Sequence, residues 1–396
     1  MVAGSGPAGA TAAIVAARRG WRVALVDQRT FPRDKPCGDG LGPGVAQLLR
    51  TLDLGHLLAG ESPATSLTVY GPSGAELNAA LTGLDGMPTE GYVVPRADFD
   101  QRLRLAALDA GALDLSGHKV TGTGLADDSR WVSVRRGGQE HRLDAGLVVA
   151  ADGAYSVLRR ALGAGRPGER TTGIAMRAYA DTDAFDPDGP LGLRMIFEWS
   201  KELLPAYGWV FPNGKGLANV GVGVMVTELR RRSLDLRRVL DGFADSCRRR
   251  GIELGDLYAH RAHHLPLARR IPRLAHRRAV LIGDAASMIN PLSGEGIVYG
   301  MNAAYRVVGG LPDDPREAVG QARALGEFER WFRHTYRSHL LSSQVAHGLM
   351  SIPWWARHMI RAANNDPVVF RDAVELLFGL GRIRAGTTWR ILRHGW

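Results

Sequence analysis

Cysteine is scarce in this chain of 396 residues, which contains only Cys37 and Cys247. Two cysteines cannot build a disulfide framework or a cysteine-rich metal site. Long apolar runs are missing as well, since no stretch reaches the ~20 residues that a membrane-spanning helix requires. The length allows a large globular protein of two or three structural units with a substantial core.

Lysine is also scarce, so the positive charge of the chain comes mainly from arginine. The only lysines are Lys35, Lys119, Lys201 and Lys215, so arginine supplies the net charge of +10. Such a balance favours acidic ligands, nucleic acid or anionic membrane surfaces. No nucleic-acid-binding motif accompanies the arginines, so we expect a solvated basic surface and no nucleic-acid partner.

The N-terminus is apolar and rich in glycine, but it lacks the basic leading region of a secretory signal. We therefore expect a cytoplasmic protein. Only Met1, Val2 and Ala3 precede the first glycine, where a longer strand is usual. We expect the natural start to lie upstream.

A GxGxxG turn at the start of the chain predicts a dinucleotide site. Gly4 permits the tight turn, Gly6 lets the backbone reach a pyrophosphate, and Gly9 packs the following helix on the strand. The apolar segment 21–26 then leads to Asp27, whose carboxylate can accept hydrogen bonds from a ribose diol. Two further glycine–acid turns close apolar runs far along the chain, at Asp152-Gly153 and Gly283-Asp284. We expect one cofactor to be held by these three distant pieces of chain.

The hydrophobic pattern predicts an α/β protein with an α+β insertion. We expect a Rossmann-like nucleotide-binding domain over 1–160, with a small hairpin excursion near 65–92, and an antiparallel-sheet substrate domain over 161–264. The chain should return to the nucleotide-binding domain over 265–310 and end in a helical region over 311–396.

Several sequence blocks, spread over most of the chain, carry a family resemblance. They are GSGPAG with Asp27, FPRDKPCGDGLGP at 31–43, VPRADFD at 94–100, YGWVFP at 207–212 and GDAASMINPLSGEGI at 283–297. With these blocks the chain resembles the geranylgeranyl reductase family of FAD-dependent oxidoreductases, within the wider group that shares the aromatic-hydroxylase fold. Gly42 departs from the threonine common in the second block, which affects the expected local shape of that loop.

The resemblance implies that the cofactor is FAD and that the Rossmann-like domain binds it. It places Asp27 on the adenosine ribose, the backbone of Val120 near adenine, and Arg96 on the phosphate or ribityl part. Asp284 would hold the ribityl chain. The cofactor-binding residues predicted from the glycine turns and the resemblance together are Gly4, Gly6, Ala8, Gly9, Asp27, Gly38, Gly40, Arg96, Val120, Asp152, Asp284, Gly294, Gly296 and Ile297.

Residues 291–297 begin a long helical segment, and a helix N-terminus attracts anions through its free N–H groups. Fully reduced flavin is anionic near N1 and C2=O at neutral pH. We assign Gly294, Gly296 and Ile297 to that end of the flavin, where they would favour the hydride-donating form.

Cys37 lies in a Pro-Cys-Gly loop that we expect to cross the reactive side of the flavin. Reduction of an isolated alkene needs a hydride at one carbon and a proton at the other. Cys37 either helps to deliver that proton as a catalytic residue or only shapes the pocket.

Tyr207, Trp209 and Phe211 alternate along an expected strand, so their side chains share one face. An apolar isoprenoid needs flat walls that hold its double bond against the flavin, and these three residues are our predicted substrate-binding set. A plain sheet core explains the same spacing, and both interpretations can hold together.

Two other clusters admit more than one interpretation. We interpret His260, His263 and His264 as structural and predict no metal site, because no acidic or cysteine partners surround them. The segment 340–360 with its tryptophans and nearby arginines suits a membrane interface, and it equally suits a helix that closes the substrate tunnel.

We therefore predict an FAD-dependent reductase that saturates C=C bonds of a polyprenyl or geranylgeranyl chain, in a lipid or an isoprenoid quinone. The alternative is an FAD-dependent monooxygenase that acts on an aromatic or terpenoid scaffold, since fold similarity does not separate the two reactions. NAD(P)H or another reductant would donate the electrons. The expected partner is an apolar or lipid substrate, with peripheral contact at the inner face of the membrane.

Overall fold

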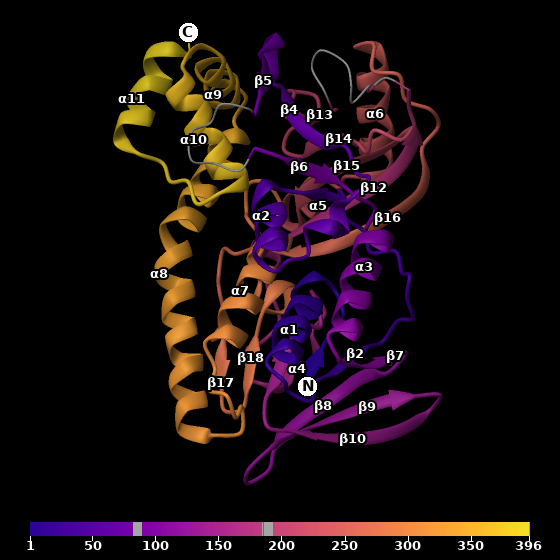
Figure 1. Ribbon diagram of the computed structural model, residues 1–396. Coiled ribbons are helices and arrows are strands. Elements are labelled where there is room, and N and C mark those ends of the chain that lie inside the picture. Colours follow the sequence, from indigo (N-terminus) through magenta and orange to yellow (C-terminus); the bar gives the residue numbers. More distant parts are fainter. Residues whose placement is uncertain (82–88, 184, 186–192, 396) are drawn as a thin grey trace.

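The computed structural model describes residues 1–81, 89–183, 185 and 193–395. Within this part of the chain, a parallel sheet, a small antiparallel meander, a larger mixed sheet and a set of C-terminal helices are distinguished (Figure 1). The predicted mixed α/β class is confirmed. Residues 82–88, which belong to the predicted excursion near 65–92, lie outside the described residues.

The parallel sheet has the strand order β17–β18–β11–β1–β2–β7. Its strands are β1 (Val2–Ala3), β2 (Ala24–Asp27), β7 (Leu113–Ser116), β11 (Val148–Ala150), β17 (Ala275–His276) and β18 (Ala279–Leu281). All neighbours pair in parallel except β17 and β18. Because β1 lies between strands from residues 24–27 and 148–150, the start of the chain pairs both with the strand that follows α1 and with a strand that comes much later.

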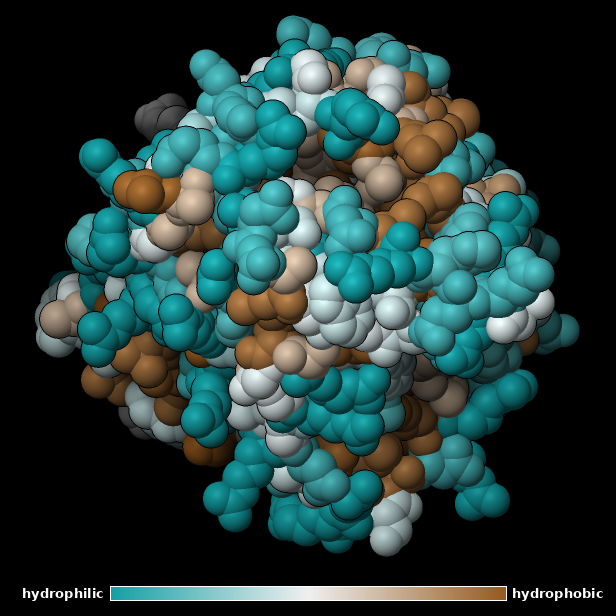
Figure 2. Space-filling model, turned by 90° about the horizontal axis from the view of Figure 1, so that it is seen from below, coloured by the Kyte–Doolittle hydropathy of each residue, from teal (hydrophilic) through white to brown (hydrophobic). Residues whose placement is uncertain are grey.

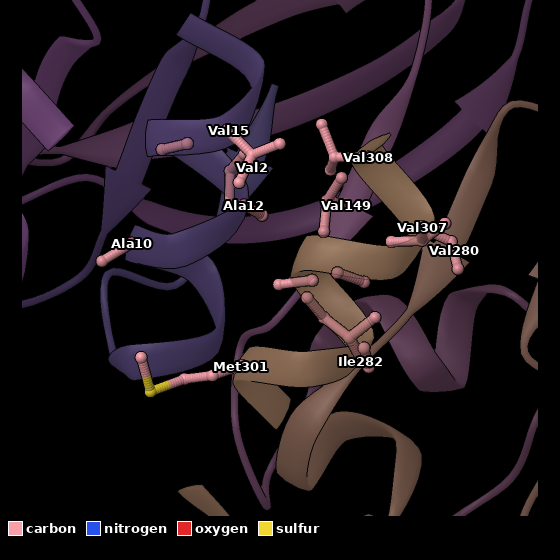
Figure 3. Close-up of a cluster of buried hydrophobic side chains, with 14 of the residues drawn as sticks. Val2, Ala10, Ala12, Val15, Val149, Val280, Ile282, Met301, Val307 and Val308 are labelled. Carbon is pink, nitrogen blue, oxygen red and sulfur yellow. The ribbon is translucent and has the colours of Figure 1, made fainter. Parts of the chain in front are cut away.

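Three helices cover one face of this sheet. They are α1 (Pro7–Arg18), α3 (Arg96–Asp109) and α7 (Ile297–Gly309), with α1 in contact with the other two (Figure 1). Valines of β1, β11 and β18 meet alanines of α1 and Val307 and Val308 of α7 in the core between them (Figure 3). A Cβ built on Gly300 would lie 3.0 Å from the Cβ of Ala8, so the glycine lets α7 approach α1.

A meander of β8 (Lys119–Leu125), β9 (Arg130–Arg136) and β10 (Gln139–Ala145) lies below the parallel sheet in Figure 1. Helix α4 (Val157–Ala161) contacts β8. Hydrophilic side chains cover most of the face seen from this end, and apolar ones are scattered among them (Figure 2).

The larger sheet has the order β16–β12–β15–β14–β13–β4–β6–β3, with β5 paired to β4. Its strands are β3 (Gly40–Leu41), β4 (Pro63–Tyr70), β5 (Glu76–Ala80), β6 (Gly91–Val93), β12 (Thr172–Asp181), β13 (Leu193–Glu198), β14 (Tyr207–Pro212), β15 (Leu217–Met225) and β16 (Tyr258–Pro266). The parallel pairing of β4 with β13 joins the excursion near 65–92 to the predicted substrate sheet. Strands from both regions thus form one continuous sheet.

Helices α5 (Val226–Arg231) and α6 (Leu236–Arg249) contact the β12–β15 part of this sheet. Leu240, Phe243 and the buried Cys247 of α6 belong to its core. Gly208 of β14 makes room for Phe243, because a Cβ on this glycine would lie 2.7 Å from the ring. Helix α2 (Pro43–Thr51) contacts α7 near the junction of the two large sheets.

The C-terminal region is helical, as the sequence predicts. It consists of α8 (Ala318–Met350), α9 (Pro353–Asn365), α10 (Pro367–Phe378) and α11 (Ala385–His394). Helix α8 runs along the molecule from β17 to α9 and α10 (Figure 1). Asp366 caps α10 by accepting the N–H of Val368 at 2.9 Å. Short 3-10 helices, η1 (Gly55–Leu58), η2 (Pro72–Gly74), η3 (Glu169–Thr171) and η4 (Gly283–Ala286), lie in the connections.

Candidate active site

A cavity of about 1400 Å³, part of it open to solvent, lies where the carboxyl ends of the parallel strands face the larger sheet. The predicted site residues that line it are Gly6, Ala8, Cys37, Gly38, Gly40, Arg96, Tyr207, Trp209, Phe211, Asp284, Gly294, Gly296 and Ile297. Residues far apart in the chain therefore converge on one space.

The glycine turn after β1 has the close contacts that its sequence predicts. Gly4 has a φ of +95°, and a Cβ at this position would lie 2.2 Å from the carbonyl oxygen of Ala151. A Cβ on Gly9 would lie 1.8 Å from the oxygen of Gly4. A Cβ on Gly6 would instead project toward the cavity, with the guanidinium of Arg33 nearest at 3.5 Å. Gly4 and Gly9 are required by the fold, whereas Gly6 keeps space free for a ligand.

The turn also has unsatisfied polar groups that fit a dinucleotide. Gly6 begins α1 without a side-chain cap, so the first N–H groups of the helix are available to an anion. The hydroxyl of Ser5 is buried and has no hydrogen-bond partner among the described residues. The carboxylate of Asp27 accepts the N–H of Ser5 at 2.8 Å and that of Arg29 at 2.9 Å. Asp27 is thus held at the end of β2 beside the turn.

A buried ion pair fixes the predicted arginine. Arg96 begins α3 and forms a bidentate pair with Asp100, at 2.7 and 2.8 Å, and Arg33 adds a contact of 2.9 Å to the same carboxylate. Burial acts to lower the pKa of Arg96, but Asp100 and a hydrogen bond with Cys37 raise it well above its ordinary value. Arg96 therefore presents a fixed positive charge to the cavity and lies next to the Cys37 thiol.

Asp284 has a partner that the sequence does not indicate. Its carboxylate accepts a hydrogen bond from Lys35 Nζ at 2.8 Å, across 249 positions of sequence. Burial acts to raise the pKa of Asp284, but the Lys35 ammonium holds it below its ordinary value. Burial and the same ammonium lower the pKa of His263 to about 4. His263 lines the cavity as a neutral ring, and its buried Nε2 has no hydrogen-bond partner among the described residues. Our structural interpretation of the histidines did not anticipate this position.

Asp39 shapes the loop that carries Cys37, and sequence reasoning missed it. Its φ is +61°, and its carboxylate accepts hydrogen bonds from Tyr179 Oη at 2.7 Å, Asn219 Nδ2 at 2.7 Å and the Arg96 N–H at 3.1 Å. Burial raises its pKa to about 6, against the opposing effect of these hydrogen bonds. Asn219 Nδ2 also donates to the carbonyl oxygen of Cys37 at 2.8 Å. This network fixes the Cys37 loop against the larger sheet.

Tyr207, Trp209 and Phe211 lie on one face of β14 and line the cavity. Successive ring centroids are 5.7 and 6.3 Å apart, which makes a continuous aromatic wall. Trp209 Nε1 donates to Asn219 Oδ1 at 2.9 Å, so the indole is tied to the residue that holds the Cys37 loop. Gly221 lies under Trp209, where a Cβ would come within 2.0 Å of the indole. The wall is therefore both packed into the sheet and exposed to the cavity.

The C-terminal helices complete this wall. Phe378 at the end of α10 lines the cavity and lies 6.1 Å from Phe197 of β13, measured between ring centroids. Buried Asn290, in the segment after β18, donates through Nδ2 to the carbonyl oxygen of Leu376 at 3.1 Å. The far end of the chain is thus attached to the segment that precedes α7.

The remaining predicted residues lie around the cavity. Gly294 has a φ of +73°, and Gly296 begins α7 without a side-chain cap, so free N–H groups face the cavity. Val120 lies in β8 with its side chain in the core. The carboxylate of Asp152 accepts the N–H groups of Val157 at 2.8 Å and Leu158 at 3.1 Å and so caps α4. It does not line the cavity, and any contact of this turn with a cofactor falls to its backbone.

Comparison with known proteins identifies the cofactor class. A family model described as FAD binding domain matches residues 1–317. The chain belongs to this FAD binding domain family. The uncapped α1, the open position at Gly6 and the orphaned hydroxyl of Ser5 are the features of this site that fit FAD.

Named relatives agree with this family. The chain is 37% identical over 302 residues to the menaquinone reductase of Mycobacterium tuberculosis, covering 76% of this chain and 73% of that protein. It is 33% identical over 310 residues to the geranylgeranyl diphosphate reductase of Rhodobacter capsulatus, covering 76% and 71%. The predicted FAD-dependent oxidoreductase and its resemblance to geranylgeranyl reductases are confirmed.

A solved structure shows the same fold. The geranylgeranyl bacteriochlorophyll reductase-like protein of Thermoplasma acidophilum superposes with a TM-score of 0.78. The two sequences are 21% identical, and the match covers 100% of this chain and 95% of that one. At this identity the likeness concerns the arrangement of sheets and helices.

Proposed function

We propose that this oxidoreductase saturates C=C bonds in the polyprenyl chain of a lipid or an isoprenoid quinone. The main support for the proposal is that one cavity is lined both by the glycine turn at Gly6 with Asp284 and by the aromatic wall. The printed names of the relatives, menaquinone reductase and geranylgeranyl diphosphate reductase, support a prenylated substrate. NAD(P)H or another reductant would supply the electrons.

Bound, reduced FAD supplies a hydride. In our proposal the N-terminus of α1 binds its pyrophosphate, Asp27 its ribose and Asp284 its ribityl chain. Arg96 adds a fixed positive charge near the phosphate or ribityl part. The uncapped N-terminus of α7 favours the anionic, reduced form.

The aromatic wall would hold an isoprenoid segment by burial of its methyl and methylene groups. Tyr207, Trp209 and Phe211 then fix the position of a double bond and exclude water from it. The network of Asp39 and Asn219 keeps the Cys37 loop at a fixed distance from this wall. Cys37 thus shapes the pocket, and proton delivery by its thiol is the additional role that a Cys37→Ser variant tests.

We further propose that the C-terminal end contacts a lipid surface. Large apolar side chains are exposed there on α8, α9, α11 and the connections before α9 and after α10: Leu341, Val345, Ile352, Trp354, Leu380, Trp389 and Leu392. Arg393 lies over the Trp389 ring at 5.1 Å, a combination suited to an anionic interface. Phe378 of α10 connects this region to the cavity. Among the described residues, no helix is both long and apolar enough to cross a bilayer.

The lipid contact is tested by flotation with vesicles that contain anionic lipid. We expect Trp389→Asp together with Leu392→Asp to reduce binding, since both side chains are exposed on α11. Val319→Asp is the matched control, because Val319 is 79% exposed at the start of α8, far from α11. Equal binding of both variants and the parent would contradict this contact.

Anaerobic turnover tests the reaction itself. The holoenzyme is reduced with dithionite, mixed with a geranylgeranyl lipid or a prenylated quinone, and the product is analysed by mass spectrometry. We expect a gain of two hydrogen atoms for each saturated double bond. Oxygen incorporation when the reduced enzyme is mixed with air and the same substrate, without any saturation under anaerobic conditions, would establish the monooxygenase instead.

A further inference from the structure

Glu295 is a buried carboxyl group without a partner in the cavity wall. It lies between Gly294 and Gly296 at the start of α7 and lines the cavity. Both carboxyl oxygens are buried, and neither has a hydrogen-bond partner in the described part of the chain. A charged carboxylate in such a place is costly, so the neutral acid is the favoured form.

The surroundings of Glu295 contain no cation that would hold its charge, as far as the described residues go. Its titratable neighbours are the phenols of Tyr299 on α7 and Tyr336 on α8. The nearby carboxylate of Asp284 is already paired with Lys35. Burial raises the pKa of Glu295 to about 8, which agrees with its unpartnered geometry.

The chain at Glu295 lies beside the proposed reacting region, and its carboxyl group lies beside the end of the Cys37 loop. A Cβ on Gly42, at the N-terminus of α2, would lie 2.5 Å from Glu295 Oε1. Two positions earlier, a Cβ on Gly40 would lie 3.4 Å from the Phe211 ring. On the other side, a Cβ on Gly294 would lie 2.7 Å from the hydroxyl of Tyr207. The carboxyl group of Glu295 thus lies against the loop that carries Cys37, and its chain neighbour Gly294 lies against the aromatic wall.

A structural role for this carboxyl group is poorly supported. The N-terminus of α2 has no side-chain cap, although Glu295 is beside it. A capping carboxylate would accept backbone N–H groups, and Glu295 accepts none among the described residues.

We propose that Glu295 is the catalytic acid of the alkene reduction, an inference that rests on the proposed function. One alkene carbon takes a hydride from the reduced flavin, and the neighbouring carbon takes the proton of Glu295. The π bond, the O–H bond of Glu295 and the flavin's bond to the transferred hydrogen break, and two C–H bonds form. The carboxylate that remains is reprotonated from solvent, and the flavin is left oxidised.

The test compares the parent and Glu295→Gln holoenzymes. After anaerobic reduction with dithionite, each is mixed with a geranylgeranyl lipid, and oxidation of the flavin is followed by its absorbance. We expect the variant to react about 10²–10⁴ times more slowly, the usual contribution of a general acid, with unchanged FAD occupancy. The parent rate should fall as the pH rises above about 8, and this decline should be missing in the variant.

A second readout does not depend on turnover. Infrared difference spectra of the oxidised holoenzyme between neutral and basic pH should show loss of a protonated carboxyl band, and Glu295→Gln should lack that change. Glu202→Gln, in an exposed turn, is the matched control and should behave as the parent in both measurements. If Glu295→Gln binds FAD poorly, Glu295→Asp replaces it and should keep the band and part of the rate.

The outcomes separate the two proposals. A Glu295→Gln enzyme with the parent's rate and pH profile would overturn the acid role and leave the reductase intact. A parent that saturates no prenyl double bond would overturn the proposed function, and the acid role with it. Absence of the carboxyl band from the parent would also refute a protonated Glu295.

Discussion

The buried acid at the start of α7 makes the stability of the protein depend on pH in a calculable way. The pKa of Glu295 is about 8 in the folded chain, against an ordinary value of 4.5. Between these two values the folded state binds more protons than the unfolded state, so stability falls as the pH rises. pH 7 lies two and a half pH units above the ordinary pKa of 4.5. Each of these pH units lowers the free energy of unfolding by about 1.4 kcal/mol, so the loss at pH 7 is about 3 kcal/mol.

Glu295→Gln removes this dependence because an amide does not titrate. We expect the variant and the parent to unfold with similar free energies near pH 4, and the variant to gain up to about 3 kcal/mol by pH 7. Urea unfolding of the apoprotein, followed by tryptophan fluorescence from pH 4 to 8, measures the difference. Glu202→Gln controls for loss of one negative charge at the surface. A difference that stays constant over this range would refute the assignment of a neutral, buried Glu295.

The remaining predictions concern the cofactor and the aromatic wall. Gly6→Val should fold but yield a colourless protein, because the φ of Gly6 is −76° and its added side chain would fill ligand space. Asp284→Ala should weaken FAD binding about ten- to hundredfold, measured by fluorescence titration, through loss of a charged hydrogen-bond acceptor worth roughly 1.5–3 kcal/mol. Trp209→Ala should retain FAD and lose about a hundredfold in alkene reduction, since misplacement by about an ångström has that effect. Cys37→Ser should keep near-normal turnover if Glu295 holds the proton.

The sequence predicts best what depends on short stretches of chain. The glycine spacing from Gly4 to Gly9 reports close contacts that any such turn must make, and the structure has them. The alternation of Tyr207, Trp209 and Phe211 predicts a shared face, which is the face that lines the cavity. In both cases neighbouring residues determine the geometry, so no distant contact has to be known.

The sequence does not predict contacts between residues that are far apart in the chain. The contact of Lys35 with Asp284 and the parallel pairing of β4 with β13 exist only after both sheets have formed. Asp152 looks the same in sequence as Asp284, but its carboxylate is used for the α4 cap. The sequence does not distinguish Glu295, because its special property is the lack of a partner among the described residues, which no local pattern records.

The order of strands in the parallel sheet determines when its strand pairs can form during synthesis of the chain. β1 is made first, yet it pairs with β11, which in turn pairs with β18. Translation at about 5–20 residues per second puts roughly 15–60 s between the glycine turn and the start of α7. During that interval the nascent chain carries apolar strands without their neighbours and half of a nucleotide site. The predicted FAD contacts, which run from Gly4 to Ile297, are therefore complete only after the start of α7 has left the ribosome.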